Sequence, residues 1–413
     1  MLSVNALDFM NYNSALKGNY RKGVHVFRCI LENPTQAADF AANLGGVCVV
    51  FGVPIGQDDR NSQQLLALLQ ASSVIDQAAL TWVSQWYPDY ADDWDTMAPD
   101  ADRAGEMAGN ELIWRAVGSS PVGAGKVIAS IAGLNCQDYA DMTAVAASST
   151  AMAAVAASST AMTAVTASST AMAAVAASQT AMAAVIANST ALNAVVSSQT
   201  AMAAVAASQT AMTAVAASST AMTAVAASST AMTAVASSYV AVAAVYGSTV
   251  AVDTIKANET AWATLTGASS EVMGKAVAIL AGLNPDSYAD MTAVAASSTA
   301  MAAVAASSTA MTAVAASTVA VNALNASALK QTYTVTSAGT GTYVIVKSGG
   351  LLVLSLLGTG ASTWTAKNFT VPDTNTVTFN TTAVSLCKTA NNLQVAYGSS
   401  STSQTATITG IPV

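Results

Sequence analysis

Apolar and small polar residues follow one another along most of this chain in a pattern that returns every ten residues. From Met142 the sequence reads MTAVAASSTA, and variants of this decad continue as far as residue 257. One slot holds methionine or another aliphatic residue, and valine or isoleucine follows three positions later. Residues three apart share one side of a helix, so each decad is predicted to carry one apolar face. The core pairs we single out are Met152 with Val155, Met202 with Val205, and Met222 with Val225.

A third slot of the decad alternates only between serine and asparagine. Both residues are preferred helix N-caps, because a short side-chain oxygen accepts a hydrogen bond from a free backbone N–H of the first turn. The alanines and methionines that follow are good helix formers. Each decad is therefore predicted to be a cap followed by about two helical turns. Representative caps are Ser148, Ser158, Asn188 and Ser208.

A continuous straight helix fits a period of ten badly. Ten residues turn through roughly 1000°, about 80° short of three full turns, so the apolar stripe would drift around the helix. Either the helix breaks at each Ser-Ser, or several helices wrap steeply around one another. A β-solenoid is the alternative, because an even period keeps strand alternation in register. The abundance of alanine, which is depleted in strands, favours helical segments.

One decad cannot bury its own apolar face, so it needs neighbours. Stacked repeats of the same chain would supply them, and so would identical chains packed around an axis. No charged residue occurs between Asp141 and Asp253, so the surface of this segment allows close approach. The decads are therefore expected to form the shaft of an elongated homo-oligomer.

A second sequence module is used twice and sets the domain boundaries. Gly125 to Asn135 matches Gly274 to Asn284 at a constant offset of 149, and Tyr-Ala-Asp-Met and new decads follow each copy. Trp114 and Trp262 precede the two copies and are expected to anchor helical knobs. The boundaries are an N-terminal head (1–109), a first knob module (110–141), the decad shaft (142–257), a second knob module (258–290), a second decad array (291–329) and a C-terminal domain (330–413).

The two ends of the chain differ from the shaft. Before residue 109, short β-branched runs and a helical stretch at 61–86 predict a compact α+β head. After residue 330, β-branched and aromatic residues between Gly, Ser and Thr turns predict an all-β domain. The fold class is therefore α+β multidomain, with a repeat shaft between two different ends. Three aromatic residues of the β domain are candidates for ligand binding: Tyr343, Trp364 and Tyr397.

Composition and charge exclude several function classes. The net charge is −8, and the 14 lysines and arginines are scattered, which argues against nucleic acid and anionic membrane surfaces. The sequence has no long block of Leu, Ile, Phe and Val, so no membrane insertion is predicted. His25 is the only histidine, and the four cysteines show no CxxC spacing. We therefore expect no catalytic, cofactor-binding or metal-binding residues and a protein that is not an enzyme. The cysteines are expected to be free thiols.

The layout of the chain resembles bacteriophage tail fibres and related virion appendages. The resemblance rests on a distinct N-terminal domain, a low-complexity Ala/Ser/Thr shaft with knobs from Met142, and a small β-rich C-terminal domain. It implies a homotrimeric structural protein that is made in the host cytoplasm and located in the virion. It also implies that residues 1–109 attach to other virion structural proteins, and that the tip meets a host surface receptor or glycan.

Two other functions stay open at this point. The chain could be a cell-surface adhesin or a carbohydrate-binding repeat protein. Residues 330–413 hold a single acidic side chain, Asp373, so hydrolysis with paired carboxylates is not expected there. Ice binding is a third hypothesis, because regular Ala/Thr repeats also serve ice-binding proteins, and a thermal-hysteresis assay discriminates it.

Overall fold

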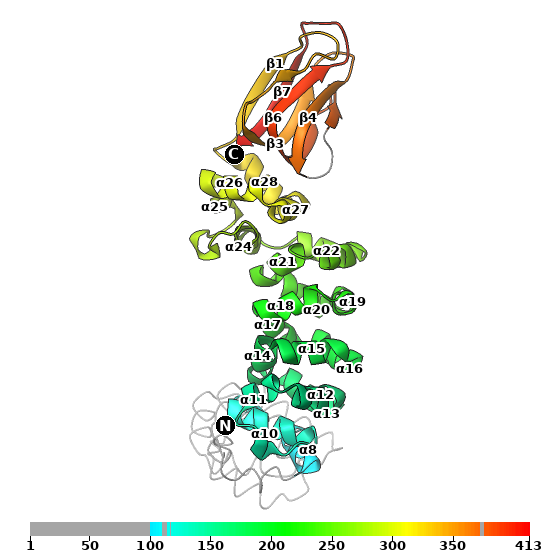
Figure 1. Ribbon diagram of the computed structural model, residues 1–413, viewed down its shortest axis with the longest axis vertical. Coiled ribbons are helices and arrows are strands. Elements are labelled where there is room, and N and C mark those ends of the chain that lie inside the picture. The colour runs from blue at the N-terminus through cyan, green and yellow to red at the C-terminus, as the bar shows by residue number, and fades with distance from the viewer. Residues whose placement is uncertain (1–99, 110–113, 116, 372–375) are drawn as a thin grey trace, which may run out of the picture. The chain divides into compact units, whose positions relative to one another are not determined.

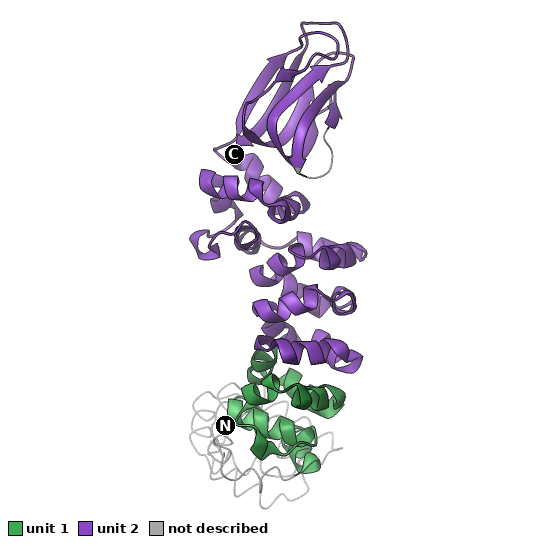
Figure 2. Cartoon of the chain, viewed as in Figure 1, with its two compact units in different colours: residues 1–175 green, residues 176–413 purple. Residues whose placement is uncertain are grey.

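The computed structural model describes residues 100–109, 114–115, 117–371 and 376–413. The chain divides into two compact units, residues 1–175 and 176–413, and each is described by itself (Figure 2). The elements expected in the head before residue 100 lie outside the described residues. The last part of the head, residues 101 to 109, forms helix α8.

Short helices make up the described part of the first unit. Their bounds are α8 (Ala101–Gly109), α10 (Pro121–Ile131), the 3-10 helix η1 (Cys136–Asp138), α11 (Met142–Ala147), α12 (Ser149–Ala157), α13 (Ser159–Ala167) and α14 (Ser169–Ala177), which ends just past residue 175.

The second unit continues with helices and ends in strands (Figure 1). The helices that complete the first decad array are α15 (Gln179–Ala187), α16 (Ser189–Ser197), α17 (Gln199–Ala207), α18 (Gln209–Ala216), α19 (Ser219–Ala227), α20 (Ser229–Ala236), α21 (Tyr239–Tyr246) and α22 (Thr249–Lys256). The helices of the second module and array are α23 (Glu259–Thr266), α24 (Ser270–Leu280), η2 (Pro285–Ser287), α25 (Met291–Ala296), α26 (Ser298–Ala306), α27 (Ser308–Ala316) and α28 (Thr318–Ala326).

Each decad folds as one short helix, and consecutive helices meet at a sharp corner. The bend is 101° between α12 and α13, 102° between α18 and α19, and 104° between α26 and α27. The corner residue is extended, as at Ser158 with φ −96° and ψ 113°, so the helix stops there. The prediction of helical segments that break at each Ser-Ser is confirmed for the described decads, and no β-solenoid forms in them.

Repeated corners of about 100° bring each helix back over the one that lies three positions earlier. In the second unit α20 packs on α17, α21 on α18 and α22 on α19 (Figure 1). One coil therefore contains three helices and thirty residues. An isolated helix of eight or nine residues is marginal in water, so this packing supplies most of its stability.

No single helix among the described residues is long and apolar enough to cross a membrane. Five pairs of consecutive helices reach the required length and composition together, but each pair is bent by 100° or more.

The duplicated sequence module gives the same local structure in each unit. Both copies contain an eleven-residue helix, α10 or α24, and a 3-10 turn that follows it. Asp141 and Asp290 then cap the next array, each with φ −159°. A Cβ added to Gly125 would lie 2.3 Å from the Asp141 carbonyl carbon, and one added to Gly274 would lie 2.2 Å from that of Asp290. The glycine that precedes each lysine is thus a helix-packing residue.

The C-terminal residues form an antiparallel seven-stranded sheet, as the all-β prediction requires. The strands are β1 (Gln331–Thr336), β2 (Val344–Ile345), β3 (Gly350–Gly358), β4 (Trp364–Val371), β5 (Thr376–Phe379), β6 (Val384–Tyr397) and β7 (Thr405–Pro412). Their order is β1-β7-β3-β6-β4-β5, with β2 paired to β6. Gly358 N–H donates to the Asn380 carbonyl (2.8 Å), so the end of β3 meets the residue after β5 and the sheet curls around its core. That core takes side chains from β3 to β7.

Changing Gly125 to alanine should lower the free energy of unfolding by roughly 1–3 kcal/mol, because the new methyl group would overlap the backbone at Asp141. Urea unfolding followed by circular dichroism measures the change. Gly105→Ala in α8 is the matched control, since nothing lies within 4 Å of the added Cβ and the helix should gain stability. Equal effects of the two substitutions would contradict this packing.

Candidate functional site

The corner residue of a decad caps its own helix, and in several decads its side chain also bonds to another coil. At Ser208 the backbone N–H donates to the Val205 carbonyl (3.1 Å), and the backbone carbonyl accepts from Met212 N–H (2.9 Å). The hydroxyl oxygen accepts from the backbone N–H of Ala211 (3.2 Å). The same hydroxyl donates to the carbonyl of Ala176 (2.5 Å), thirty-two residues earlier.

This long-range bond recurs along the second unit and forms a ladder from coil to coil. The donors and acceptors are Ser228 to Val196 (2.6 Å), Ser238 to Ala206 (2.5 Å), Ser248 to Ala216 (2.6 Å), Asn258 to Ala226 (3.0 Å) and Ser327 to Ala295 (2.5 Å). We call these bonds the corner ladder. Every acceptor lies in the last turn of a helix, where carbonyls have no partner within that helix. The ladder therefore joins the start of one helix to the end of another.

The proposed caps all lie at helix starts. Ser148, Ser158, Asn188 and Ser208 are the N-caps of α12, α13, α16 and α18. Asn258 shows why asparagine is the one alternative to serine. Its Oδ1 accepts from Ala261 N–H (3.0 Å), while its Nδ2 donates to Ala226. Serine and asparagine can each accept and donate from one short side chain.

The methionine and valine slots lie inside the coil. Exposure is 0% to 1% for all six residues that the sequence singles out: Met152, Val155, Met202, Val205, Met222 and Val225. A further core slot was missed, the alanine directly before the methionine slot. Ala151, Ala201 and Ala221 are fully buried, and this position is alanine throughout both arrays except at their starts, where Asp141 and Asp290 precede the methionine. Its N–H is the one that the corner side chain caps, which leaves room only for a methyl group. Its invariance within the repeat was the available signal.

Larger side chains replace the usual residues where the first array ends. Trp262 takes a methionine slot, is half-buried, and meets Tyr246 edge-on at 6.4 Å, with Lys256 Nζ 5.1 Å from its ring centre. The Tyr246 hydroxyl is buried and has no hydrogen-bond partner in the described part of the chain, and burial raises its pKa. In the first unit Trp114 is 5% exposed and donates from Nε1 to the Ala164 carbonyl (3.0 Å). Each tryptophan packs inside its own unit.

The second module stays attached to the first array through α24. This helix packs on α21, and Lys275 Nζ lies 5.6 Å from the ring centre of Tyr239. Lys275 also donates to Glu271 Oε1 (2.9 Å), and this hydrogen bond raises the pKa of the amine. Lys126, the matching lysine of the first module, is buried and donates to the Cys136 carbonyl (3.0 Å). Both lysines of the duplicated module are thus structural.

The structure overturns two of the three candidate binding aromatics in the β domain. Trp364 is 0% and Tyr397 is 3% exposed, because both rings are part of the core, where their centres lie 5.0 Å apart with the ring planes tilted by 41°. Trp364 Nε1 donates to the Thr359 carbonyl, and the Tyr397 hydroxyl accepts from Ser362 N–H. Tyr343 is 38% exposed, with Lys367 Nζ 3.6 Å from its ring centre, and stays a candidate for ligand contact.

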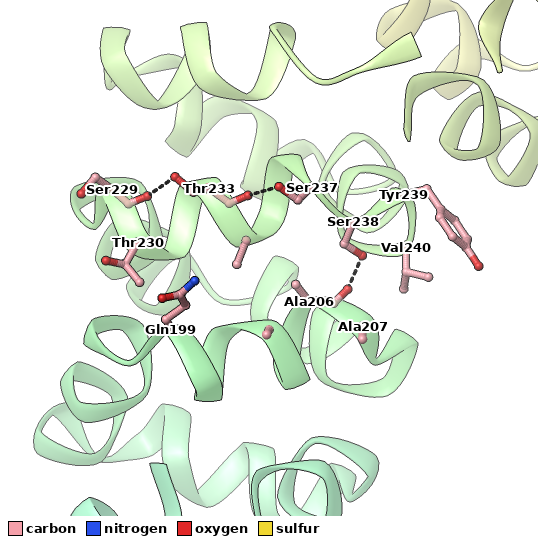
Figure 3. Close-up of a pocket in the computed structure, with 12 residues that line it drawn as sticks. Gln199, Ala206, Ala207, Ser229, Thr230, Thr233, Ser237, Ser238, Tyr239 and Val240 are labelled. Atoms are coloured by element: carbon pink, nitrogen blue, oxygen red, sulfur yellow. Dashed lines mark hydrogen bonds between the residues drawn. The ribbon is translucent and has the colours of Figure 1, made fainter. Parts of the chain in front are cut away.

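A groove of about 720 Å³ lies between α17 and α20 and reaches the start of α21 (Figure 3). Its lining is uncharged and includes alanines together with Gln199, Thr230 and Tyr239. Thr233 and Ser237 also line it, but their hydroxyls donate back into α20 at 2.8 Å. The residues that line the groove include no carboxylate, amine, imidazole or thiol, and its polar groups are amide and hydroxyl groups.

Titratable and metal-ligating groups are sparse in the described ranges. They contain no cluster of three His, Cys, Asp or Glu side chains that could hold a metal ion. Burial raises the pKa of the Cys387 thiol to about 12, which makes it an unreactive thiol at neutral pH. No family model matches the chain, and no curated protein matches it either. The corner ladder is therefore the most distinctive site that the chain contains.

Replacing Ser238 with alanine should cost roughly 1–3 kcal/mol of unfolding free energy, because the cap of α21 and the bond to Ala206 are lost together. Urea unfolding of the full chain measures the loss. Ser238→Asn should recover most of it, since Asn258 does both tasks in the native chain.

Ser237→Ala is the matched control, because its hydroxyl is exposed and bonds only within its own helix. If Ser237→Ala and Ser238→Ala cost the same, the ladder does not stabilise the coil.

Proposed function

We infer that the chain is a non-enzymatic structural protein, in which the decad coils act as a spacer that carries the β domain. The observation that supports this role most directly is the corner ladder, because each coil is bonded to the coil before it by the same residue type. Such an array can be lengthened coil by coil without a new fold at each step. Length is then set by the number of decads.

The decads bury their apolar side chains within one chain. This burial bears on the expectation of a homotrimer. Methionine and valine of every described decad of the first array are buried by helices of the same chain, at 0% to 6% exposure. The need to bury these side chains therefore gives no reason for a second or third chain around the shaft. We propose a spacer that folds as a single chain, and any oligomer would form through other surfaces.

The order of the parts supports a proposal about the larger setting. A spacer between an N-terminal region and a β domain is the arrangement of a virion appendage such as a phage tail fibre. The N-terminal region would attach to other virion proteins, and the β domain would meet the host surface. Tyr343 is the aromatic residue that supports contact with a receptor or glycan, because its ring is exposed beside Lys367. A cell-surface adhesin would use the same arrangement.

Inserting a second copy of residues 201–230 should lengthen the spacer by one coil. Asn193 in α16 and Asp253 in α22 are exposed and occupy the same decad slot two coils apart. Spin labels there should lie about 20 Å apart, and the insertion should raise this to about 30 Å, since packed helices are 8–10 Å apart. Double electron–electron resonance measures the distance between the two labels. The labels are attached to unnatural amino acids, so that the native cysteines are not labelled.

The matched control is an insertion of thirty Gly and Ser residues at the same point, which should broaden the distance distribution. Labelled chains are diluted in excess unlabelled chain, so that only distances within one chain are measured. A distance that stays at its original value after the decad insertion would rule out the spacer, since extra decads would then bulge out instead of extending the coil.

A further inference from the structure

Strand β1 forms an edge of the C-terminal sheet. It pairs with β7 over all six of its residues, from Gln331 opposite Gly410 to Thr336 opposite Thr405. Its other side has no strand partner among the described residues. An edge strand exposes a row of backbone donors and acceptors that can pair with another chain.

The hydrogen bonds to β7 reveal which backbone groups face outward. Ser337 N–H donates to the Gln404 carbonyl (2.8 Å), so position 337 belongs to a hydrogen-bonded pair. Such pairs alternate along an antiparallel ladder, and Tyr333 and Val335 therefore bond to β7 as well. Thr332, Thr334 and Thr336 then direct their N–H and C=O groups away from the sheet. Their side chains are exposed, whereas those of Tyr333 and Val335 pack on the core.

Three usual protections of an edge strand, namely proline, charge and a bulge, are missing from β1. The strand QTYTVT contains no proline and no charge, and its register with β7 is unbroken by a bulge. The nearest charge, Lys330, turns away, since its Nζ donates to the Asn325 carbonyl of α28. The opposite edge, β5, is shorter, with four residues. β1 is thus the longer of the two edges, and no strand of the described residues pairs with its outer side.

We propose that β1 is a self-association surface, and that a second copy of this chain pairs with it antiparallel about a two-fold axis at Thr334. Thr334 then lies opposite Thr334 of the other copy, and Thr332 lies opposite Thr336. All three threonines exchange both backbone hydrogen bonds with the other copy. Tyr333 lies opposite Val335 on the core side, and aromatic–β-branched and Thr–Thr pairs are favourable cross-strand neighbours.

The pattern of faces favours this register over its neighbours. A slip by one residue would place threonines opposite Tyr333 and Val335 and would mix the core and solvent faces. A slip by two residues keeps the faces but loses hydrogen-bonded pairs at one end. The strand is neutral, so pairing brings no like charges opposite each other. The interface is separate from the decad coils and goes beyond the spacer function, which would stand without it.

The mass of the full chain in solution tests the proposal. Light scattering after size exclusion should give twice 41.2 kDa at high concentration and 41.2 kDa on dilution. Thr334→Pro should weaken dimerisation at least ~tenfold, because it removes an outward N–H and places the ring against the other copy. The N–H of Thr334 is not used within the sheet, so the fold should persist, as proline is tolerated at an outward edge position.

Thr334→Val is the matched control, because it keeps the N–H and the β-branched shape and should dimerise as the native chain does. Circular dichroism of all three chains shows whether the sheet is intact. Thr334→Cys should add a disulfide-linked dimer under mild oxidation beyond that of the native chain. Thr332→Cys should add much less, since it faces Thr336.

Two results would overturn the proposal. One is a chain that stays monomeric up to about 100 μM, far above the usual range of specific association. The other is an oligomer, dimeric or trimeric, whose stability is unchanged by Thr334→Pro in a folded protein. The second result would assign self-association to another surface or to a pairing that avoids β1.

Discussion

The structure of the decad array depends on one side chain with two hydrogen bonds. In the corner ladder, the serine or asparagine accepts from the third amide of its own helix and donates to a carbonyl near the end of a helix one coil earlier. Without the first bond, an amide of the first turn of a two-turn helix has no hydrogen-bond acceptor. Without the second bond, no side-chain hydrogen bond fixes one coil against the next. Both bonds need a short side chain that is donor and acceptor at once. The alternation of only serine and asparagine at this slot follows directly from that requirement.

The apolar part of the coil obeys the same geometry. Corners of about 100° place three helices in each coil, and their inner faces are lined by alanine, methionine and valine. The alanine next to the capped amide brings the backbones close together, and the flexible methionine fills the space that remains. The outer faces need only stay soluble, and serine, threonine and alanine do this without charge. The result is an uncharged array whose specific side-chain hydrogen bonds lie at the corner residues.

Much of this could be predicted from the sequence because the repeat acts as its own alignment. The period, the cap slot and the Met/Val core slots all follow from comparing one decad with the next. The three-helix coil could not be predicted, since it depends on the corner angle and on hydrogen bonds between residues thirty-two positions apart in the sequence. The buried positions of Trp364 and Tyr397 were missed for a similar reason. Glycines at 358 and 360 let these rings pack against the backbone, and strand alternation alone does not show which aromatic faces inward.

Residue-resolved hydrogen exchange on the full chain, read by electron-transfer fragmentation, tests the corner geometry most directly. The coil predicts a ten-residue period, with fast exchange at the first two helical amides of each decad. Slow exchange should follow at the capped alanine and at the corner residue. A continuous helix would protect every amide of the decad alike, and strands would give an alternating pattern. Either of those results would contradict the three-helix coil.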